Sequence, residues 1–295
     1  MKLLHILTLL AAALLAPASE AATPSASLHT PSPQVPRTVT LWGKTLDIDT
    51  RDLYERLDRE LTAQTYTHGT TLLTLKRVPR YRPVIEPILR RNGVPADMFY
   101  LACIESNLDN RALSPAKAAG IWQFMAATAR QYGLEVNDYV DERYNLEKAT
   151  EAACRYLKEA YGKYGDWNTV AAAYNAGQSR ISKALEAQNR DNALELYLNT
   201  ETSRYPFRIM AAKLILENPA QYGFTLTPDQ FYPPHDCRTE TVNYAVDSWV
   251  DWARKRGLTY AQLREANPWI RAYSLPNKTG KKYVVRLPQP ASLRR

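Results

Sequence analysis

The feature that most constrains this fold is a long stretch, from Val94 to about Gly223, with dense helical signals and almost no strand-like alternation. Capping residues divide the stretch into separate helices, because Asn and Asp favour the first position and Gly the position after the last. The predicted helices are the segment after Pro95, one from Asn145 to Tyr164, one between Asp166 and Gly177, and one from about Thr202 to Asn218. The sequence therefore predicts a compact all-helical domain over residues 93–224.

The first 21 residues are typical of a secretory signal peptide. Lys2 precedes an apolar run from Leu3 to Ala16, and the small residues Ser19 and Ala21 suit cleavage after Ala21. The alternative, a membrane helix, is disfavoured because the run is shorter than the roughly 20 residues that span a bilayer. Residues 22–40, rich in Pro and Ser, are predicted to be a disordered tether. We therefore expect an exported protein of the periplasm or cell envelope.

The segments on either side of the central stretch have patterns of their own. Residues 41–92 show apolar residues at helical spacing, and we expect Gly69, Pro79 and Pro83 to divide them into short helices. Residues 239–290 follow a Pro-rich linker and predict strand, helix, helix, strand, with Asp247 and Thr259 as helix caps. The sequence thus predicts a mainly α protein with a small βααβ module at its C-terminal end.

Composition limits the possible partners only loosely. The formal charge is +8, and it stays +8 without the signal peptide because Lys2 and Glu20 cancel. The basic residues form no stripe, which disfavours nucleic acid as a partner, while a wall polymer that carries carboxylates suits the charge. The three cysteines (Cys103, Cys154, Cys237) are odd in number and lack metal-site spacing. We expect no metal and no cofactor, and buried free thiols at Cys103 and Cys154.

Glu105 is the residue that most indicates chemistry. On the helix MFYLACIES it shares an apolar face with Met98, Leu101 and Ala102. A carboxyl in such a setting is desolvated, so its pKa rises and it can serve as a general acid near neutral pH. The alternative is a buried ion pair with Arg111 or Arg143, and the pattern alone leaves both open.

Three ordered strings resemble the lytic transglycosylases of the goose-lysozyme-like superfamily, especially the membrane-bound lytic transglycosylase D group. They are IESNLDNRALSPAKAAGIWQFMAATARQYGL, WNTVAAAYNAGQSRI and ETSRYPFRIMA, which together cover roughly residues 93–224. The resemblance implies a lysozyme-like helical fold that cleaves the β-1,4 bond between N-acetylmuramic acid and N-acetylglucosamine in peptidoglycan without water. Glu105 matches the family's catalytic acid, and the implied product is a 1,6-anhydromuramyl end, the result of a carbon–oxygen lyase.

The same resemblance implies roles for the polar residues of these strings. Ser106 and Gln123 would offer hydrogen bonds at the cleft, while Tyr174, Asn175 and Tyr205 would orient the sugar or the acid. Other interpretations stay open, because Gln123 and Asn175 could make purely structural hydrogen bonds and both tyrosines could be core aromatics with satisfied hydroxyls. Trp122 and Phe124 are expected in the core.

Two residues depart from the family's pattern. Asp109 lies four residues after Glu105, which on a continuing helix would place both on one face. A second carboxylate at about 5 to 5.5 Å is what a retaining glycosidase uses, so lysozyme-type hydrolysis remains an alternative activity. We expect Asp109 instead to face solvent or to cap the following turn. Pro206 follows Tyr205, where the family usually has another residue.

The C-terminal module resembles a lysin motif (LysM), a small βααβ domain that holds N-acetylglucosamine-containing glycans. The string SWVDWARKRGLTYAQLREANPWI, followed by Gly280 and YVVRLP, carries the resemblance. A degenerate copy that only packs on the catalytic domain is the alternative, and some of Trp249, Trp252 and Trp269 should be core. A wall-binding protein with an inactive catalytic domain is a further alternative, which the intact motifs disfavour.

Overall fold

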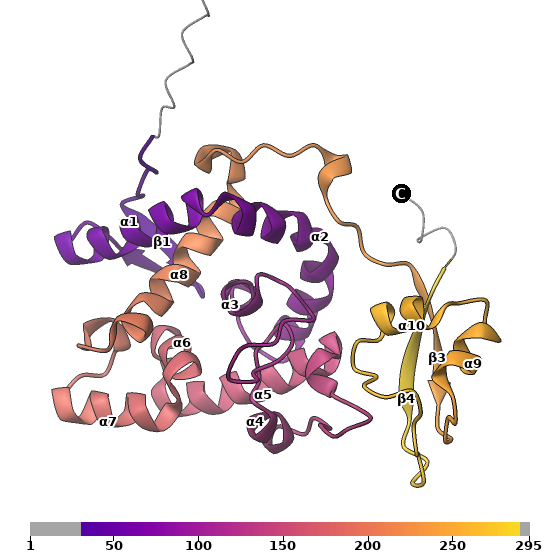
Figure 1. Cartoon of the computed structure of the whole chain (residues 1–295). Coiled ribbons are helices and arrows are strands. Elements are labelled where there is room, and N and C mark those ends of the chain that lie inside the picture. The colour runs from indigo at the N-terminus through magenta and orange to yellow at the C-terminus, as the bar shows by residue number, and fades with distance from the viewer. Residues whose placement is uncertain (1–30, 290–295) are drawn as a thin grey trace, which may run out of the picture. The chain divides into compact units, whose positions relative to one another are not determined.

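Helices account for most of the computed structural model, which describes residues 31–289 (Figure 1). The α-helices are α1 (Arg51–Tyr66), α2 (His68–Arg91), α3 (Met98–Ser106), α4 (Ala126–Gln131), α5 (Leu146–Tyr164), α6 (Trp167–Ala176), α7 (Gln178–Gln188), α8 (Thr200–Glu217), α9 (Trp249–Arg254) and α10 (Tyr260–Ala266). Single 3₁₀ turns are η1 (Glu142–Tyr144), η2 (Ala193–Glu195), η3 (Pro219–Tyr222) and η4 (Pro228–Gln230). The prediction of a mainly α protein is confirmed. Among the described helices, none combines the length and apolarity needed to cross a bilayer.

Strands are few and form two antiparallel pairs. β1 (Thr38–Leu41) pairs with β2 (Lys44–Asp47), and β3 (Cys237–Val242) pairs with β4 (Tyr283–Pro288). The register runs from Thr38 opposite Asp47 in the first pair, and from Cys237 opposite Pro288 in the second. The first pair corrects one prediction, because the tether was expected to extend to residue 40 and regular structure begins at Thr38. The predicted signal peptide lies outside the described residues.

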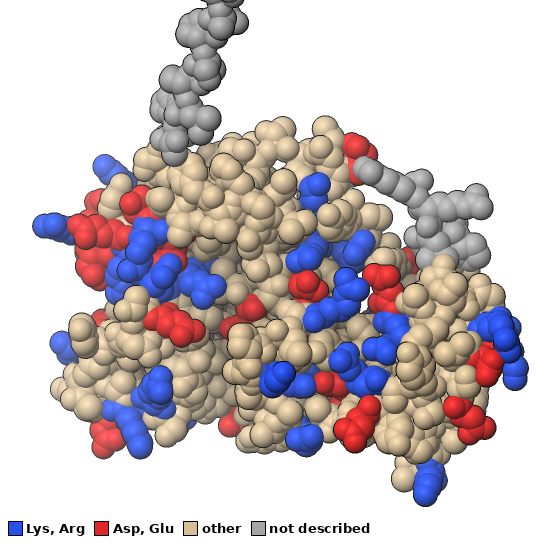
Figure 2. Space-filling model, viewed as in Figure 1, with Lys and Arg blue, Asp and Glu red and all other residues tan. Residues whose placement is uncertain are grey.

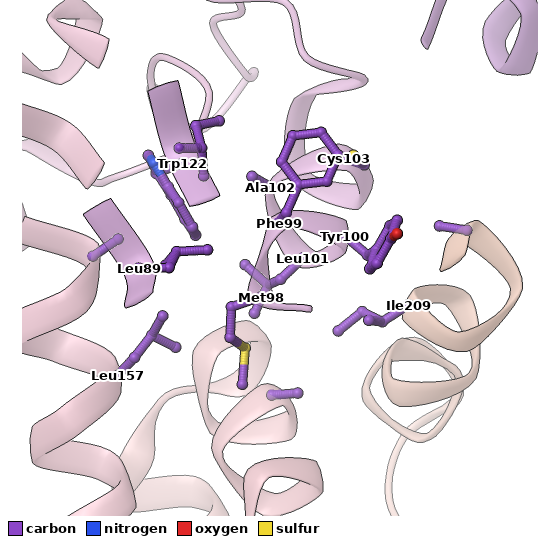
Figure 3. Close-up of a cluster of buried hydrophobic side chains, with 14 of the residues drawn as sticks. Leu89, Met98, Phe99, Tyr100, Leu101, Ala102, Cys103, Trp122, Leu157 and Ile209 are labelled. Atoms are coloured by element: carbon purple, nitrogen blue, oxygen red, sulfur yellow. The ribbon is translucent and has the colours of Figure 1, made fainter. Parts of the chain in front are cut away.

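Helix α3 lies at the centre of the helical core (Figure 3). Its first six side chains, Met98 to Cys103, are each at most 3% exposed, and they point in all directions toward α2, α8 and the ring of Trp122. A helix that is apolar all round belongs to the interior, so the expected single apolar face is replaced by complete burial. Glu105 comes two residues after this run and is half-buried. The core therefore presents a carboxyl group at its edge.

The predicted caps of the central helices are largely as the sequence indicates. The Asn145 side chain accepts a hydrogen bond from the Lys148 amide at 3.1 Å at the start of α5, and Asp166 accepts one from Thr169 at 2.8 Å at the start of α6. Helix α8 begins two residues earlier than expected, after Asn199. These caps fix where α5, α6 and α8 start around α3.

Helix α2 corrects the expectation of short helices over residues 41–92. It is continuous through Pro79, Pro83 and Pro87 and changes direction along its length (Figure 1). Each proline removes one backbone hydrogen bond, but a spacing of four places the three rings on one side of the helix. Buried apolar residues of α2, among them Ile85 and Leu89, pack into the core. Tertiary packing thus outweighs the local cost of the prolines.

The C-terminal module has the predicted order β3, α9, α10, β4. Ser248, not Asp247, caps α9 by accepting from the Asp251 amide at 3.1 Å, whereas Thr259 caps α10 together with Gln262 as predicted. Trp249, Trp252 and Trp269 are all buried. The tryptophans therefore build the small core of the module.

The module is docked on the helical domain by backbone pairing, apolar burial and ion pairs. The Asp141 amide donates to the Trp269 carbonyl at 2.9 Å, and the Arg271 amide donates to the Tyr139 carbonyl at 2.9 Å. The apolar cluster of the module includes Ala119, Val140 and Tyr144 of the helical domain. Lys281, just before β4, and Tyr283 on β4 contact Glu135, and Arg286 of β4 contacts Glu147. Three residues of the helical domain are therefore part of the apolar cluster of the module, which is separate from the main core of the helical domain.

Candidate active site

Glu105 is placed by the end of α3. The helix stops at Ser106 because Asn107 and Leu108 take left-handed conformations, with φ of 51° and 56°. The Tyr205 hydroxyl, from α8, donates a hydrogen bond to Glu105 Oε1. Tyr205 is 1% exposed, and the packing around its ring fixes the position of the hydroxyl. The site therefore joins an acid at the core's edge to a fixed hydrogen-bond donor.

The surroundings of Glu105 bring its pKa into the physiological range. Burial raises the pKa to about 7, and the Tyr205 hydrogen bond and the charge of Arg208 act in the opposite direction. The carboxylate of Glu201 is a smaller upward contribution within this value. A group with a pKa close to neutral can both give and accept a proton, which is the requirement for acid–base catalysis.

The alternative of a buried ion pair at Glu105 is wrong. Arg143 makes a bidentate pair with Asp141, with nitrogen–oxygen distances of 2.9 and 2.7 Å. Arg111 lies 3.6 Å from Glu265 of the C-terminal module. Both expected partners are thus occupied elsewhere, and the Glu105 carboxyl contacts a neutral hydroxyl instead.

Tyr174 is a second tyrosine close to Glu105. Its hydroxyl donates to the Trp122 carbonyl at 2.6 Å, and its ring packs edge-on against Tyr156 at 5.2 Å. Burial and the nearby charge of Glu105 hold the pKa of Tyr174 well above its ordinary value, so the hydroxyl stays protonated. Trp122 is fully buried and donates from Nε1 to Thr150 at 2.9 Å, which confirms its expected place in the core. Tyr174 combines a core ring with a satisfied hydroxyl.

The turn that carries Gln123 depends on a close backbone approach. A Cβ on Gly120, whose φ is +78°, would lie 2.0 Å from the Arg143 carbonyl oxygen. Gln123 adopts a φ of 49°, and its Nε2 donates to the Gly120 carbonyl at 2.8 Å. The Ser106 hydroxyl donates to the Ala102 carbonyl at 3.2 Å. Both polar side chains therefore make local structural hydrogen bonds.

Asn175 connects α6 to the first turn of α8. Its Oδ1 accepts from the Thr202 hydroxyl at 3.0 Å, and its Nδ2 donates to Glu201 at 3.2 Å. Sequence reasoning missed Glu201 and Arg208, the two charged residues of α8 that act on the pKa of Glu105. Their signal was available, because they lie four residues before and three after Tyr205, and hence on its side of the helix.

Asp109 does not share a helical face with Glu105. The chain leaves α3 before reaching it, and its carboxylate accepts from the Arg111 amide at 2.9 Å and lies 3.5 Å from Arg77. Its side chain is 41% exposed. Asp109 therefore does not share a helical face with Glu105, and the expectation that it caps the following turn is confirmed.

The prediction of buried free thiols at Cys103 and Cys154 is confirmed. Cys103 and Cys154 are buried free thiols, and burial raises the pKa of Cys154 to about 12. Within residues 31–289, no three His, Cys, Asp or Glu side chains gather as they would around a metal ion.

The helical fold places a half-buried carboxyl with a pKa of about 7 at the edge of its core, an arrangement that suits acid–base chemistry. Comparison with known families makes the assignment specific. Residues 82–196 match the transglycosylase SLT domain, and residues 238–291 match the soluble lytic transglycosylase C-terminal LysM-like domain. The chain therefore contains a transglycosylase SLT domain, and its C-terminal module is LysM-like.

Individual relatives agree with the family. Membrane-bound lytic murein transglycosylase D of Escherichia coli K12 is 28% identical over 239 residues, which is 78% of this chain and 50% of the relative. The peptidoglycan transglycosylase gp16 of Escherichia phage T7 is 37% identical over 120 residues, 39% of this chain and 9% of the relative. The chain thus spans about half the length of the lytic murein transglycosylase D relatives it matches.

Two solved structures with 15% sequence identity were also found. An inactive mutant of the lytic transglycosylase Slt from Pseudomonas aeruginosa gives a TM-score of 0.40 and covers 61% of this chain and 35% of its own. The 70 kDa soluble lytic transglycosylase from Escherichia coli gives 0.41, with 61% and 33% covered.

Proposed function

We propose that this protein is a peptidoglycan lytic transglycosylase in which Glu105 serves first as acid and then as base. One observation carries the proposal: the half-buried Glu105 carboxyl, with a pKa of about 7, accepts a hydrogen bond from the buried Tyr205 hydroxyl. The SLT domain match and the similarity to lytic murein transglycosylase D support the same activity.

The reaction needs one proton to leave Glu105 and one to return. Glu105 protonates the oxygen of the β-1,4 bond, and the bond from that oxygen to the muramyl C1 breaks. The muramyl C6 oxygen then bonds to C1, and its proton passes to the Glu105 carboxylate, which restores the acid. No water is added, so the product is a 1,6-anhydromuramyl end, as in carbon–oxygen lyases. The Tyr205 hydroxyl stabilises the intermediate carboxylate, because a hydrogen bond to the charged form favours that form.

The remaining candidate residues are proposed to shape the cleft around this acid. The side chains of Ser106, Gln123, Tyr174 and Asn175 already make the hydrogen bonds described above. Their contribution is therefore to hold the walls in place, and hydroxyl and carbonyl oxygens among them keep lone pairs that accept hydrogen bonds from the sugar. The LysM-like module is proposed to contact the glycan strand.

Mass spectrometry of the products tests the activity. Incubation of residues 22–295 with purified peptidoglycan should release muropeptides about 18 Da lighter than hydrolysed ones, the mass of the water that is not added. Glu105→Gln should release none while keeping its circular dichroism spectrum, and Asp109→Asn should release the same anhydro products as the wild type. Products with water added, or loss of activity in Asp109→Asn, would instead identify a hydrolase.

We also propose export to the periplasm or cell envelope, on the basis of the signal-peptide pattern in residues 1–21. The similar Escherichia coli protein is named as membrane-bound. Intact-mass measurement of protein expressed with its own N-terminus should give a chain that begins at Ala22, and a chain that retains Lys2 would contradict cleavage.

A further inference from the structure

A cavity of about 240 Å³ lies beside the candidate acid, with walls from α1, α2, α3 and α8. Ile104, the residue before Glu105, lines this side cavity, and so does Arg208, three residues after Tyr205. The cavity is smaller than the 300–1,000 Å³ that is usual for whole ligands. It therefore suits one arm of a larger ligand whose reacting bond lies at Glu105.

The side cavity carries one unpaired positive charge. Glu60 is 1% exposed and accepts two hydrogen bonds from Arg204, of 2.7 and 3.0 Å, and one from Arg59, of 2.9 Å, so the charge of Arg204 has a counter-ion. The guanidinium of Arg208 makes no hydrogen bond or ion pair with any residue of the described part of the chain, although its charge reaches Glu105. In Figure 2, basic side chains gather on the surface over α1 and α8. An anionic group of a ligand would therefore supply the missing counter-ion of Arg208.

The other walls offer apolar surface and hydrogen-bond acceptors. Ala212, Ile215 and Leu216 of α8 form an apolar side. Gln64 donates from Nε2 to the Arg208 carbonyl at 2.9 Å, and Thr71 donates its hydroxyl to the Gln64 carbonyl, so the remaining oxygen lone pairs of both side chains can accept. Acceptors for amide N–H groups, apolar surface for methyl groups and one cation for a carboxylate match a short acidic peptide better than a neutral sugar.

We infer that the side cavity binds the peptide arm of peptidoglycan, with Arg208 pairing a peptide carboxylate. The inference rests on the proposed function, since it assigns the substrate arm that extends from the bond cleaved at Glu105. Arg208 is in this view a specificity-determining residue, and the enzyme favours glycan strands that carry peptides over strands from which an amidase has removed them.

Kinetics on both kinds of strand test the inference. Arg208→Gln should lower kcat/KM on peptide-bearing strands at least about tenfold more than on bare strands, mainly through KM, because a charge-assisted hydrogen bond is lost. Arg208→Lys should recover part of the preference. Arg180→Gln removes one charge from an exposed position on α7 and should leave the preference unchanged. The change that Arg208→Gln causes in the pKa of Glu105 affects both substrates, so the ratio isolates recognition.

A second variant reduces the cavity without changing charge. Ala63 lines the cavity from an exposed position on α1, and Leu is a good helix former, so Ala63→Leu should fold normally and lower the same ratio. Equal loss on both substrates in Arg208→Gln, or an unchanged ratio in both variants, would overturn the inference alone. Failure of the wild type to cleave either kind of strand would overturn the proposed function and the inference with it.

Discussion

Removing the Tyr205 hydroxyl should make Glu105 a weaker acid. In Tyr205→Phe the ring and its packing remain, and only the donor to the Glu105 carboxylate is lost. A hydrogen bond to a charged group contributes about 1.5–3 kcal/mol. That energy corresponds to a reduction of about 10- to 150-fold in the acid dissociation constant of Glu105. The pKa of about 7 in the wild type therefore moves upward in the variant.

The upward direction of the change in the Glu105 pKa determines its effect on activity. A higher pKa keeps Glu105 protonated to higher pH, but a weaker acid transfers its proton to the glycosidic oxygen more slowly, and the carboxylate formed in that step lacks the hydrogen bond from Tyr205. The pH–rate profile of kcat/KM should shift to the alkaline side, and the rate at neutral pH should fall. Carboxyl NMR with labelled glutamate follows the same ionisation without substrate.

Tyr100→Phe is the matched control. Tyr100 lies on α3 and is also buried. Its hydroxyl donates to Glu217 at 2.7 Å and not to Glu105. This variant loses a comparable tyrosine–glutamate bond, so the titration of Glu105 should stay where it is. An unchanged or lowered Glu105 midpoint in Tyr205→Phe would refute the reasoning, because the hydroxyl would then not favour the carboxylate.

Three further outcomes are expected. The free energy of unfolding of Glu105→Gln should rise relative to that of the wild type by up to about 3 kcal/mol between about pH 5 and about pH 8. In the wild type, the raised pKa of Glu105 stabilises the fold at low pH, and this stability is lost as pH rises through the pKa of the folded state, whereas Gln does not titrate. Thermal melts at several pH values measure the difference. Gly120→Ala should lower Tm far more than Gly177→Ala, since both have positive φ but only the first brings a Cβ against the Arg143 carbonyl, and equal losses would point to backbone strain alone. Calorimetry should show one unfolding transition for the helical domain and the LysM-like module, because Val140 and Ile270 lie in one apolar cluster, and two separate transitions would show that this cluster does not couple their unfolding.

Local signals predicted those parts of the fold that local interactions decide. Asn145, Asp166 and Thr259 cap their helices because a short polar side chain bonds to the next turn whatever surrounds it. The course of α2 could not be read this way, because its prolines are tolerated through packing with residues distant in sequence. Tertiary contacts therefore decide what propensity alone assigns wrongly.

The candidate site shows the same division. Glu105 could be found from an acidic residue within an apolar helix, and its contact with Tyr205 joins residues 100 positions apart. Asp109 does not lie on the face of Glu105, because helical spacing ends at Ser106, where two left-handed residues turn the chain away. Spacing within α8 places Glu201 and Arg208 on the side of Tyr205, but their influence on the acid also depends on how α8 packs against α3, which the sequence does not show.

The docking of the LysM-like module changes what a carbohydrate-binding module can contribute. A module on a flexible linker raises the effective concentration of its ligand over every position that the linker reaches. Here the backbone pairing of Tyr139 and Asp141 with residues 269–271, together with the contact between Arg286 and Glu147, leaves the module one position. A glycan strand held by it would meet Glu105 at one fixed separation, so the module would determine how far along the polymer from its own contact the bond is cleaved.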